Sequence, residues 1–308
     1  MLVLAGALIA IWLGHSPVAV ESRVIAVAFS SNGGWLAAGT RSGRITIWLL
    51  DGWRKISSLD QEGGALNHLA FSPDGRLLAA AGRLLRLWQV ATGAEAIKVG
   101  SDGSVYGVAS FSPDGRTLAT VNAREQIQLW DVVTGRERLR LCCVALYGEV
   151  AFSPDGRLLA AAGHWPRLWD VEAGREVRRL VKTRDPTFGA VAFSPDGRLL
   201  ATGDQEGKAR VWDVATGRQL RFSRAHPDYV ESLAFHPNGR LLAYRGRGGL
   251  VTLWDIATGS QQTIRAGVAS SNVAYSPDGR WLVFGDPKGA VHVWDTRSGR
   301  EVPGPPGG

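Results

Sequence analysis

The chain is a tandem repeat, and its clearest unit runs from Phe193 to Asp213 with the sequence FSPDGRLLATGDQEGKARVWD. Three short apolar runs in this unit are separated by polar turns at 194–197 and 204–207. The first turn, Ser-Pro-Asp-Gly, suits a type I turn because proline supplies the fixed φ of the second position. Short runs joined by tight turns predict an antiparallel meander, and none is long enough for an amphipathic helix.

The same unit recurs along almost the whole chain at a nearly constant spacing. A leading aromatic residue recurs every 40 to 42 residues, at Phe29, Phe71, Phe111, Phe152, Phe193, Phe235 and Tyr275. A closing tryptophan recurs with it, at Trp48, Trp88, Trp130, Trp169, Trp212, Trp254 and Trp294. A period of about 40–45 residues that ends in Trp-Asp is typical of four-stranded propeller blades.

The closing residues carry a family resemblance. Five units end in Trp-Asp, at Trp130-Asp131, Trp169-Asp170, Trp212-Asp213, Trp254-Asp255 and Trp294-Asp295, whereas the first two end in Trp48-Leu49 and Trp88-Gln89. On these motifs the chain resembles the WD-repeat (WD40) family, with repeats of the bacterial type, over roughly residues 20–300. The resemblance implies an all-β fold, a seven-bladed β-propeller of four-stranded antiparallel blades.

The repeat sets the expected domain organisation. We expect an N-terminal apolar segment at 1–22, one propeller at 23–302 and a Pro/Gly tail at 303–308. A ring of blades is one architectural unit, because each blade buries its faces only against its neighbours. The seven units are predicted at 24–60, 66–99, 105–141, 148–180, 189–222, 230–264 and 271–302.

The segment Met1–Leu13 is almost entirely apolar and has two interpretations. It is too short to span a bilayer as a helix, which needs about 20 residues, but it has the length of a signal-peptide core. Members of the WD-repeat family commonly close the ring with a strand from the other terminus. Because the tail after Val302 is rich in proline, which lacks a ladder N–H, we expect part of Ala7–Leu13 to pair outside Ala290–Asp295. A signal or anchor segment is the alternative.

The net charge of +7 has a plain source at the hairpins. Arginine follows the turn glycine in six units, and five of these arginines sit beside a turn aspartate, as Arg198 sits beside Asp196. We interpret them as paired charges that aid solubility and not as a phosphate-binding surface. The two cysteines, Cys142 and Cys143, are adjacent and therefore cannot form a disulfide framework, so they give no evidence of export.

Residues for catalysis or for metal binding are not arranged in a known pattern. The six histidines and two cysteines lack metal-ligand spacing, and no nucleophile elbow or phosphate loop is present. An enzyme working in a central channel would need acid–base groups at the channel-facing strand starts. We assign those positions to the small or apolar residues Val24, Leu66, Val105, Gly148, Gly189 and Val230. We therefore expect no catalytic residue, no cofactor and no metal.

The resemblance also allows a test of blade rigidity. Many WD repeats link a His, a Ser or Thr, an Asp and the closing Trp by buried hydrogen bonds. Only His226 occupies the His position here, and the Asp position, six residues before the Trp, holds no aspartate, although Glu206 could replace it. We expect the complete network to be absent and the blades to depend on apolar stacking, with the tryptophans as filler.

Binding is the expected function, because propeller loops carry recognition and the resemblance implies a scaffold for protein partners. The turns between second and third strands are shortened by two residues in the second and fourth units, and the fourth contains Gly163-His164-Trp165-Pro166. Drift in a tolerant loop and a partner footprint both explain this. Aromatic residues and arginines anchor interfaces, so the candidates on this face are Arg83, Tyr147, His164, Trp165, His226, Tyr229, Arg245 and Arg247.

The sequence also suggests two alternative functions and a cellular location. A nucleic-acid-binding propeller is the alternative suggested by charge and by Arg245-Gly246-Arg247-Gly248-Gly249. A module of a larger signalling protein is another, because the resemblance includes bacterial proteins in which such propellers follow a kinase. We expect a monomeric, cytoplasmic propeller with a protein partner. Membrane contact is expected only if residues 1–13 anchor the chain, and export or membrane tethering is the alternative location.

Overall fold

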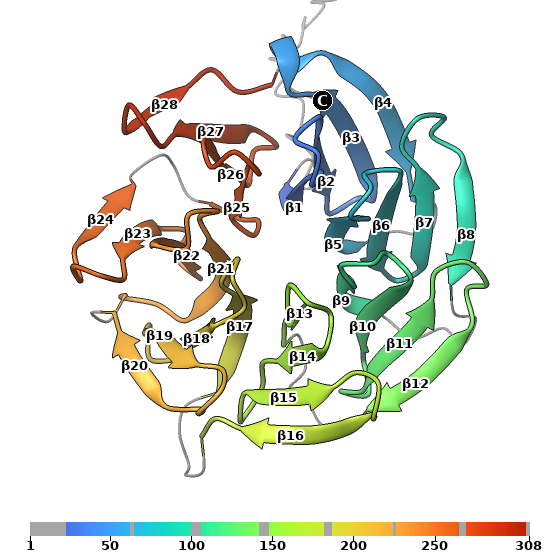
Figure 1. The fold of residues 1–308 in the computed structure, drawn as a ribbon. Coiled ribbons are helices and arrows are strands. Elements are labelled where there is room, and N and C mark those ends of the chain that lie inside the picture. Colours follow the sequence, from blue (N-terminus) through green and yellow to red (C-terminus); the bar gives the residue numbers. More distant parts are fainter. Residues whose placement is uncertain are drawn as a thin grey trace, which may run out of the picture.

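The described chain forms a ring of seven four-stranded antiparallel sheets, which confirms the predicted fold class (Figure 1). The computed structural model describes residues 23–61, 65–99, 106–141, 148–181, 187–223, 226–264 and 269–305. Each sheet is a blade made from four consecutive strands, so that the first strand lies at the axis and the fourth at the rim. Sequence unit and structural unit therefore coincide.

The strands are short and follow one another in sequence order. Blades 1 to 3 contain β1 (Val24–Phe29), β2 (Trp35–Thr40), β3 (Arg44–Leu49), β4 (Lys55–Asp60), β5 (Leu66–Phe71), β6 (Leu77–Gly82), β7 (Leu85–Gln89), β8 (Glu95–Val99), β9 (Tyr106–Phe111), β10 (Thr117–Asn122), β11 (Ile127–Asp131) and β12 (Glu137–Leu141). Blades 4 and 5 contain β13 (Val150–Phe152), β14 (Leu158–Ala161), β15 (Arg167–Asp170), β16 (Arg175–Arg179), β17 (Phe188–Phe193), β18 (Leu199–Asp204), β19 (Ala209–Asp213) and β20 (Gln219–Phe222). Blades 6 and 7 contain β21 (Val230–Phe235), β22 (Leu241–Gly246), β23 (Val251–Asp255), β24 (Gln261–Ile264), β25 (Ala274–Tyr275), β26 (Trp281–Gly285), β27 (Val291–Asp295) and β28 (Arg300–Val302). A short 3-10 helix, η2 (Asp51–Trp53), precedes β4.

The Ser-Pro-Asp-Gly turns have the geometry that their residues predict. In blade 5 the Gly197 N–H donates to the Ser194 carbonyl at 2.8 Å, and Gly197 takes the φ of +71° that favours glycine. The Ser194 hydroxyl donates to Asp196 at 2.6 Å and accepts from the Leu199 N–H at 2.9 Å. Asp196 in turn accepts from the Arg198 N–H at 3.1 Å, so the turn aspartate has the structural role assigned to it.

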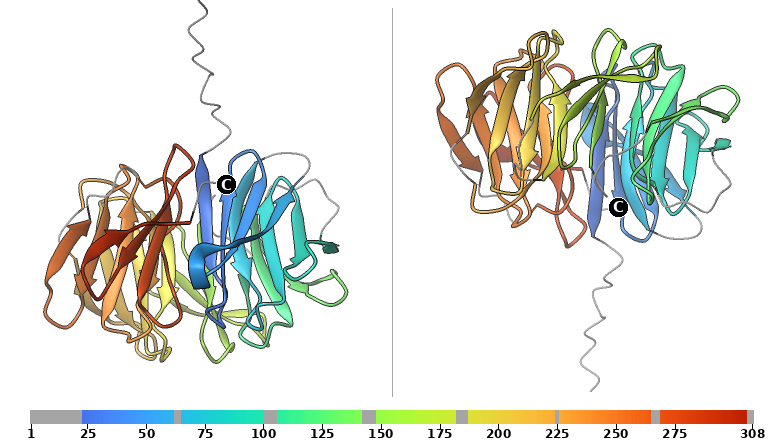
Figure 2. Two further views of the ribbon diagram at one scale, coloured as in Figure 1. Left: turned by 90° about the horizontal axis from the view of Figure 1, so that it is seen from above. Right: turned by 90° about the horizontal axis from the view of Figure 1, so that it is seen from below.

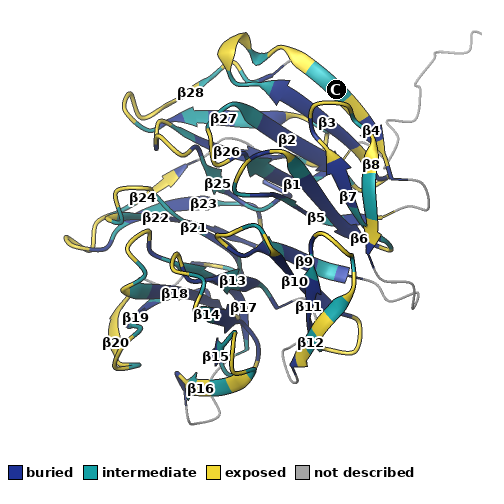
Figure 3. Ribbon diagram, turned by 45° about the vertical axis from the view of Figure 1, so that its right-hand side comes forward, coloured by how far each residue is buried: buried dark blue, intermediate teal, exposed yellow. Residues whose placement is uncertain are grey.

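The core lies between blades, as a repeat architecture requires. One cluster joins Leu87 of blade 2 to Ala109 and Trp130 of blade 3, and the equivalent residues join the other pairs of blades. Colouring by burial shows this arrangement, because the inner strands are buried and the outer strands β16 and β20 are largely exposed (Figure 3).

Blade 7 has a fourth strand of its own, which the sequence did not lead us to expect. Strand β28 pairs with β27, with Val302 opposite Val293 and Arg300 opposite Asp295. The three residues before the prolines are therefore sufficient for an outer strand. The expected pairing of Ala7–Leu13, like the whole segment 1–22, lies outside the described residues.

The ring closes through contacts between blades 7 and 1. The Asn272 side chain accepts from the Val27 N–H at 2.8 Å and donates to the Val27 carbonyl at 2.9 Å. The Ser270 hydroxyl donates to the Val24 carbonyl at 2.6 Å, and an apolar cluster that includes Val24, Val283 and Val293 fills the seam. Among the described residues, closure thus uses complete blades and no exchanged strand.

Seen from its edge the ring is a disc with two different faces (Figure 2). The Ser-Pro-Asp-Gly turns lie on one face, which we call the hairpin face. The turns between second and third strands and the connections between blades lie on the other, which we call the connection face. The Arg41 N–H on the second-to-third-strand turn donates to the carbonyl of Arg23, just before β1, at 2.9 Å, which confirms that the two kinds of loop share a face. No helix within the described ranges is long and apolar enough to cross a membrane.

The closing tryptophans are not only filler. Trp130 and Trp212 donate their indole N–H groups to Thr120 and Thr202 on the second strand, at 2.8 and 2.9 Å. In blades 1, 2 and 4, the described part of the chain provides no partner for the indole N–H of Trp48, Trp88 or Trp169. Two blades therefore retain one link of the four-residue network, which the sequence analysis did not foresee.

Candidate functional site

Two of the sequence candidates lie together on the second-to-third-strand turn of blade 4. His164 is exposed, and its Nδ1 atom lies 3.2 Å from the hydroxyl of Thr187. The Trp165 ring is half-buried between the guanidinium groups of Arg167 and Arg179, which lie 5.9 and 5.2 Å from its centre. The Trp165 ring also packs against the apolar cluster between blades 4 and 5.

A second group of candidates lies on blade 6. The carboxylate of Glu231 binds Arg245 at 3.0 Å and Arg247 at 2.9 Å. The guanidinium of Arg247 lies 5.7 Å from the centre of the Tyr229 ring, and 73% of the Arg247 side chain is exposed. Burial raises the pKa of Tyr229 to about 12, so its hydroxyl stays protonated and can donate a hydrogen bond at neutral pH.

Two candidates on blade 6 are buried, which corrects their interpretation as exposed loop residues. Only 7% of Arg245 is exposed, because it lies within β22 with its charge directed to Glu231. His226 is also 7% exposed and packs edge-on against Tyr244. Its Nδ1 atom accepts from the Asp228 N–H at 3.3 Å, and burial lowers its pKa, so both residues support the turns instead of presenting a surface.

The loops of blades 4, 5 and 6 form one continuous stretch of the connection face. The Phe188 N–H donates to the Gly163 carbonyl at 2.8 Å, and the Gln205 N–H donates to the Thr187 carbonyl at 2.9 Å. The His226 N–H then donates to the Gly207 carbonyl at 2.6 Å. We call the side chains along this stretch the blade 4–6 arc: His164, Trp165, Thr187, Tyr229 and Arg247.

Two candidates fall outside the arc. Arg83 is exposed on the equivalent turn of blade 2, three positions around the ring from the arc's centre in blade 5. Tyr147 lies outside the described residues. The structure therefore brings together four of the eight candidates, places Arg245 and His226 beneath them, and separates Arg83.

The central channel contains polar side chains that the sequence analysis missed. A cavity of about 730 Å³ is lined by the first strands and includes His68, Glu149, Ser232 and Asn272. Val24, Leu66 and Val230, which we had assigned to the channel, are instead buried between blades, and Val105 lies outside the described residues. The assignment of an apolar channel is therefore wrong.

The four polar residues occupy the same position in their units, three residues before the leading aromatic. Each bonds to the next blade, at the residue that lies two positions before the leading aromatic of that blade. Glu149 accepts from the Val191 N–H at 3.2 Å, and Ser232 accepts from the Val273 N–H at 3.1 Å. His68 bonds the backbone of Ala109, and Asn272 bonds Val27 as described. An alignment of the seven units at the leading aromatic would have revealed these polar residues at one shared position.

The electrostatics of the channel keep two of these groups uncharged at neutral pH. Burial raises the pKa of Glu149 to about 8, against the effects of the Val191 N–H and the charge of Arg245, and Glu231 raises it further. Burial lowers the pKa of His68 to about 4. Both side chains can therefore serve as neutral hydrogen-bonding groups between blades.

Among the described side chains, no group of three or more His, Cys, Asp and Glu residues is arranged to hold a metal ion.

The geometry defines the class as a seven-bladed β-propeller built from WD-type repeats. Comparison with family profiles agrees: residues 6–48 match the profile described as WD domain, G-beta repeat, and residues 51–302 match the one described as Outer membrane protein assembly factor BamB. The second match covers more than half of the chain, so the chain belongs to the family of that profile, and both matches and the seven blades show a WD40-like β-propeller. A search of curated proteins gives no significant match. The fold and the two matches identify a propeller of the kind that mediates protein interactions in general.

Proposed function

We propose that this propeller is a non-catalytic scaffold that binds a protein partner through the blade 4–6 arc. The observation that carries the proposal is the arc itself, where His164, Trp165, Tyr229 and Arg247 lie on adjoining loops of one face. Aromatic and arginine side chains dominate binding energy at protein interfaces. The arc thus combines the right residue types with a continuous surface.

The arc is also held in place before any partner arrives. Its loops are tied by the main-chain hydrogen bonds described above, and Arg247 is fixed by both Glu231 and the Tyr229 ring. A surface that is already ordered loses less conformational entropy on binding, which favours affinity. This rigidity supports recognition of a folded surface or a motif of defined shape.

Capture of partners from the source cell tests the proposal. We expect wild-type protein to retain a defined protein that the variant His164→Ala/Trp165→Ala loses. The control variant Asp155→Ala/Arg157→Ala changes the hairpin face of the same blade and should retain it. If the arc variant and the control retain the same proteins as wild type, the arc is not the binding surface.

The surroundings of the arginine-glycine motif at 245–249 argue against nucleic-acid binding. Of the two arginines in Arg245-Gly246-Arg247, one is buried and both share the carboxylate of Glu231. A gel-shift assay at low salt with duplex and single-stranded DNA tests it, since phosphate contacts are strongest there.

The description of the BamB profile supports a second candidate, a factor that assists outer-membrane protein assembly. It differs from our proposal in location, because we propose a cytoplasmic protein and this candidate would act at the cell envelope. Fractionation of the source cell separates the two. Recovery with the envelope would favour export or a membrane anchor, and also the reading of residues 1–13 as a targeting segment.

A further inference from the structure

The second-to-third-strand turns of the propeller carry a repeated charge. Five of these seven turns have an exposed arginine or lysine, and His164 occupies the turn of blade 4. We call the five residues the basic crown: Arg41, Arg83, Arg124, Arg247 and Lys288. The crown surrounds the channel mouth on the connection face and is interrupted at blade 5, where the turn has Glu206.

Within the described part of the chain, most of the crown has no compensating charge. No described carboxylate lies within 4.0 Å of the side-chain nitrogens of Arg41, Arg83, Arg124 or Lys288. Arg247 has one, but it shares Glu231 with Arg245, so this group of three retains a net positive charge. Among the described residues, the crown thus carries more positive charge than its carboxylate partners neutralise.

Several arginines of the opposite face are paired with aspartates. Arg240 and Arg280 pair with the closing aspartates Asp255 and Asp295, at 2.7 and 3.5 Å. Arg76 lies 3.9 Å from Asp74, and the same pair recurs in blade 5 at 4.0 Å. The turn aspartates also put a negative charge near Arg116 and Arg157 in the sequence, although no described carboxylate lies within 4.0 Å of either guanidinium.

We infer that the partner of the connection face is an acidic protein segment whose carboxylates pair with the basic crown. This inference rests on the proposed function and specifies the chemistry of the partner. Arginine presents a planar fork of donors that matches a carboxylate in two bonds, and four of the five crown residues are arginine. Clusters of arginine are a recurrent device for binding acidic motifs.

The pattern of charge favours a protein over a uniform polyanion. Glu206 interrupts the crown, and Glu125 and Asp228 lie on the same loops, where they would repel a nucleic-acid backbone or an anionic bilayer. A protein segment can place neutral or basic residues opposite these carboxylates.

Two triple variants with the same net charge test the inference in the full chain. Arg41→Ala/Arg83→Ala/Arg124→Ala removes three cations from the connection face, and Arg76→Ala/Arg116→Ala/Arg157→Ala removes three from the hairpin face. The probe is fluorescein-labelled polyglutamate of about 20 residues, followed by fluorescence anisotropy. We expect the first variant to weaken binding about tenfold and the second less than about twofold, with wild-type binding falling steeply as salt rises.

Further binding measurements distinguish between classes of partner. Equal losses in both triple variants would mean that only net charge matters, and would overturn the inference. Tighter, crown-dependent binding of duplex DNA or of phosphatidylglycerol vesicles than of polyglutamate would also overturn it. Circular dichroism and unfolding curves verify that both variants remain folded.

The two proposals fail in different ways. If a partner captured in the cell depends on His164 and Trp165 but is retained by the crown variant, the proposed function stands and an acidic partner is wrong. If polyglutamate binding depends on the crown but no protein capture depends on the arc, the charge recognition stands and the scaffold proposal is wrong.

Discussion

Single polar side chains in the channel connect blades that are otherwise held by apolar contact. The position three before the leading aromatic is Ala26, His68, Val108, Glu149, Ala190, Ser232 and Asn272 in the successive blades. The inner edge of a first strand has backbone groups with no neighbouring strand, and a buried unpaired group costs about 1–3 kcal/mol. The four polar members satisfy such groups on the next blade and so fix the angle between blades.

Titration of Glu149 makes the stability of the folded protein depend on pH. Its pKa is raised from 4.5 to about 8, so across that range the folded protein holds a proton that the unfolded chain has released. The contribution of Glu149 to stability is therefore complete at low pH and is lost as pH rises through the folded pKa. The variant Glu149→Gln has no titrating group, so its melting temperature should rise relative to wild type between pH 5 and about 8.

The control for this experiment is Glu172→Gln, which neutralises an exposed carboxylate on the same blade. Its melting temperature should differ from wild type by a nearly constant amount over the same pH range. A constant difference for Glu149→Gln as well would show that Glu149 does not have a raised pKa.

Asn272 should contribute most among the channel residues, because it pairs with both backbone groups of Val27 at the seam. We expect Asn272→Ala to lower the free energy of unfolding by about 2–3 kcal/mol in urea. Asn67→Ala is the matched control, since Asn67 makes one hydrogen bond, to the Tyr106 carbonyl between blades 2 and 3. A loss no greater than that of the control would mean that the seam does not depend on Asn272.

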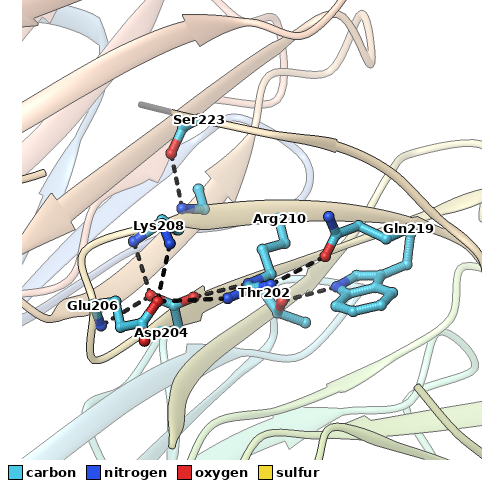
Figure 4. Close-up of polar contacts among 9 residues, drawn as sticks. Thr202, Asp204, Glu206, Lys208, Arg210, Gln219 and Ser223 are labelled. Atoms are coloured by element: carbon cyan, nitrogen blue, oxygen red, sulfur yellow. Dashed lines mark hydrogen bonds and ion pairs between the residues drawn. The ribbon is translucent and has the colours of Figure 1, made fainter. Parts of the chain in front are cut away.

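At the scale of the element, the second-to-third-strand turn of blade 5 is held by a network of charged side chains (Figure 4). Asp204 is fully buried and accepts from the backbone N–H groups of Glu206 and Lys208, at 3.0 and 2.9 Å. Its second oxygen binds the Arg210 guanidinium at 2.8 Å. Arg210 also lies against the Phe188 ring, so this network joins the turn to the first strand of the blade.

Replacement of Asp204 by asparagine isolates the ion pair. Asparagine keeps an acceptor for the two turn amides but places an NH₂ group against Arg210. Of the described carboxylates, the largely buried guanidinium then keeps only the more distant one of Glu206, at 3.9 Å. We expect Asp204→Asn to cost about 3 kcal/mol of unfolding free energy, measured by chemical denaturation. Asp286→Asn is the control, because Asp286 caps the blade 7 turn in the same way and its second oxygen faces His292, at 3.3 Å, instead of an arginine. Equal losses of unfolding free energy in Asp204→Asn and Asp286→Asn would show that the ion pair with Arg210 adds nothing to the turn contacts.

The elements show which parts of a repeat a sequence can predict. The Ser-Pro-Asp-Gly turns were predictable because each residue has a local reason for its place. The buried aspartate of blade 5 was not, because we sought it six residues before Trp212 and it lies eight before, at the end of β18. The outer strand β28 was also missed, because the prolines after Val302 led us to expect that the tail could not form a ladder strand.

At the scale of the whole molecule, the rim is more tightly packed on one side. A Cβ on Gly93, Gly135, Gly174 or Gly217, each in a third-to-fourth-strand hairpin, would meet the outer strand of the preceding blade within 3.2 Å. The equivalent Gly259 and Gly299 have open space around them. Consistent with this, all four residues of β20 are exposed, including Phe222 at 61%.

The uneven rim predicts uneven hydrogen exchange. Amides of β20 and β24, whose outer sides are not covered by the next hairpin, should exchange faster than those of β8 and β12. Exchange followed by mass spectrometry on the intact protein measures this directly. Equal protection of the four strands would show that the open rim has no effect on local stability.

The number of blades and their topology could be predicted because seven copies of one pattern average out local ambiguity. The site could be predicted only in part, because recognition depends on departures from that pattern. His164, Trp165, Tyr229 and Arg247 were identified as turn residues, but burial of Arg245 and His226 follows from the path of β22 and from the packing of Tyr244. Residue type alone does not carry that information.

Because each blade is one contiguous stretch of chain and the seam between blades 7 and 1 has no shared strand among the described residues, every described junction in the circle lies between whole blades. A gene for such a ring can gain, lose or reshuffle whole units by unequal recombination without cutting a sheet in two. A circular permutant with new termini between β12 and β13, and with Val302 joined to Arg23 by a linker, should fold into the same propeller.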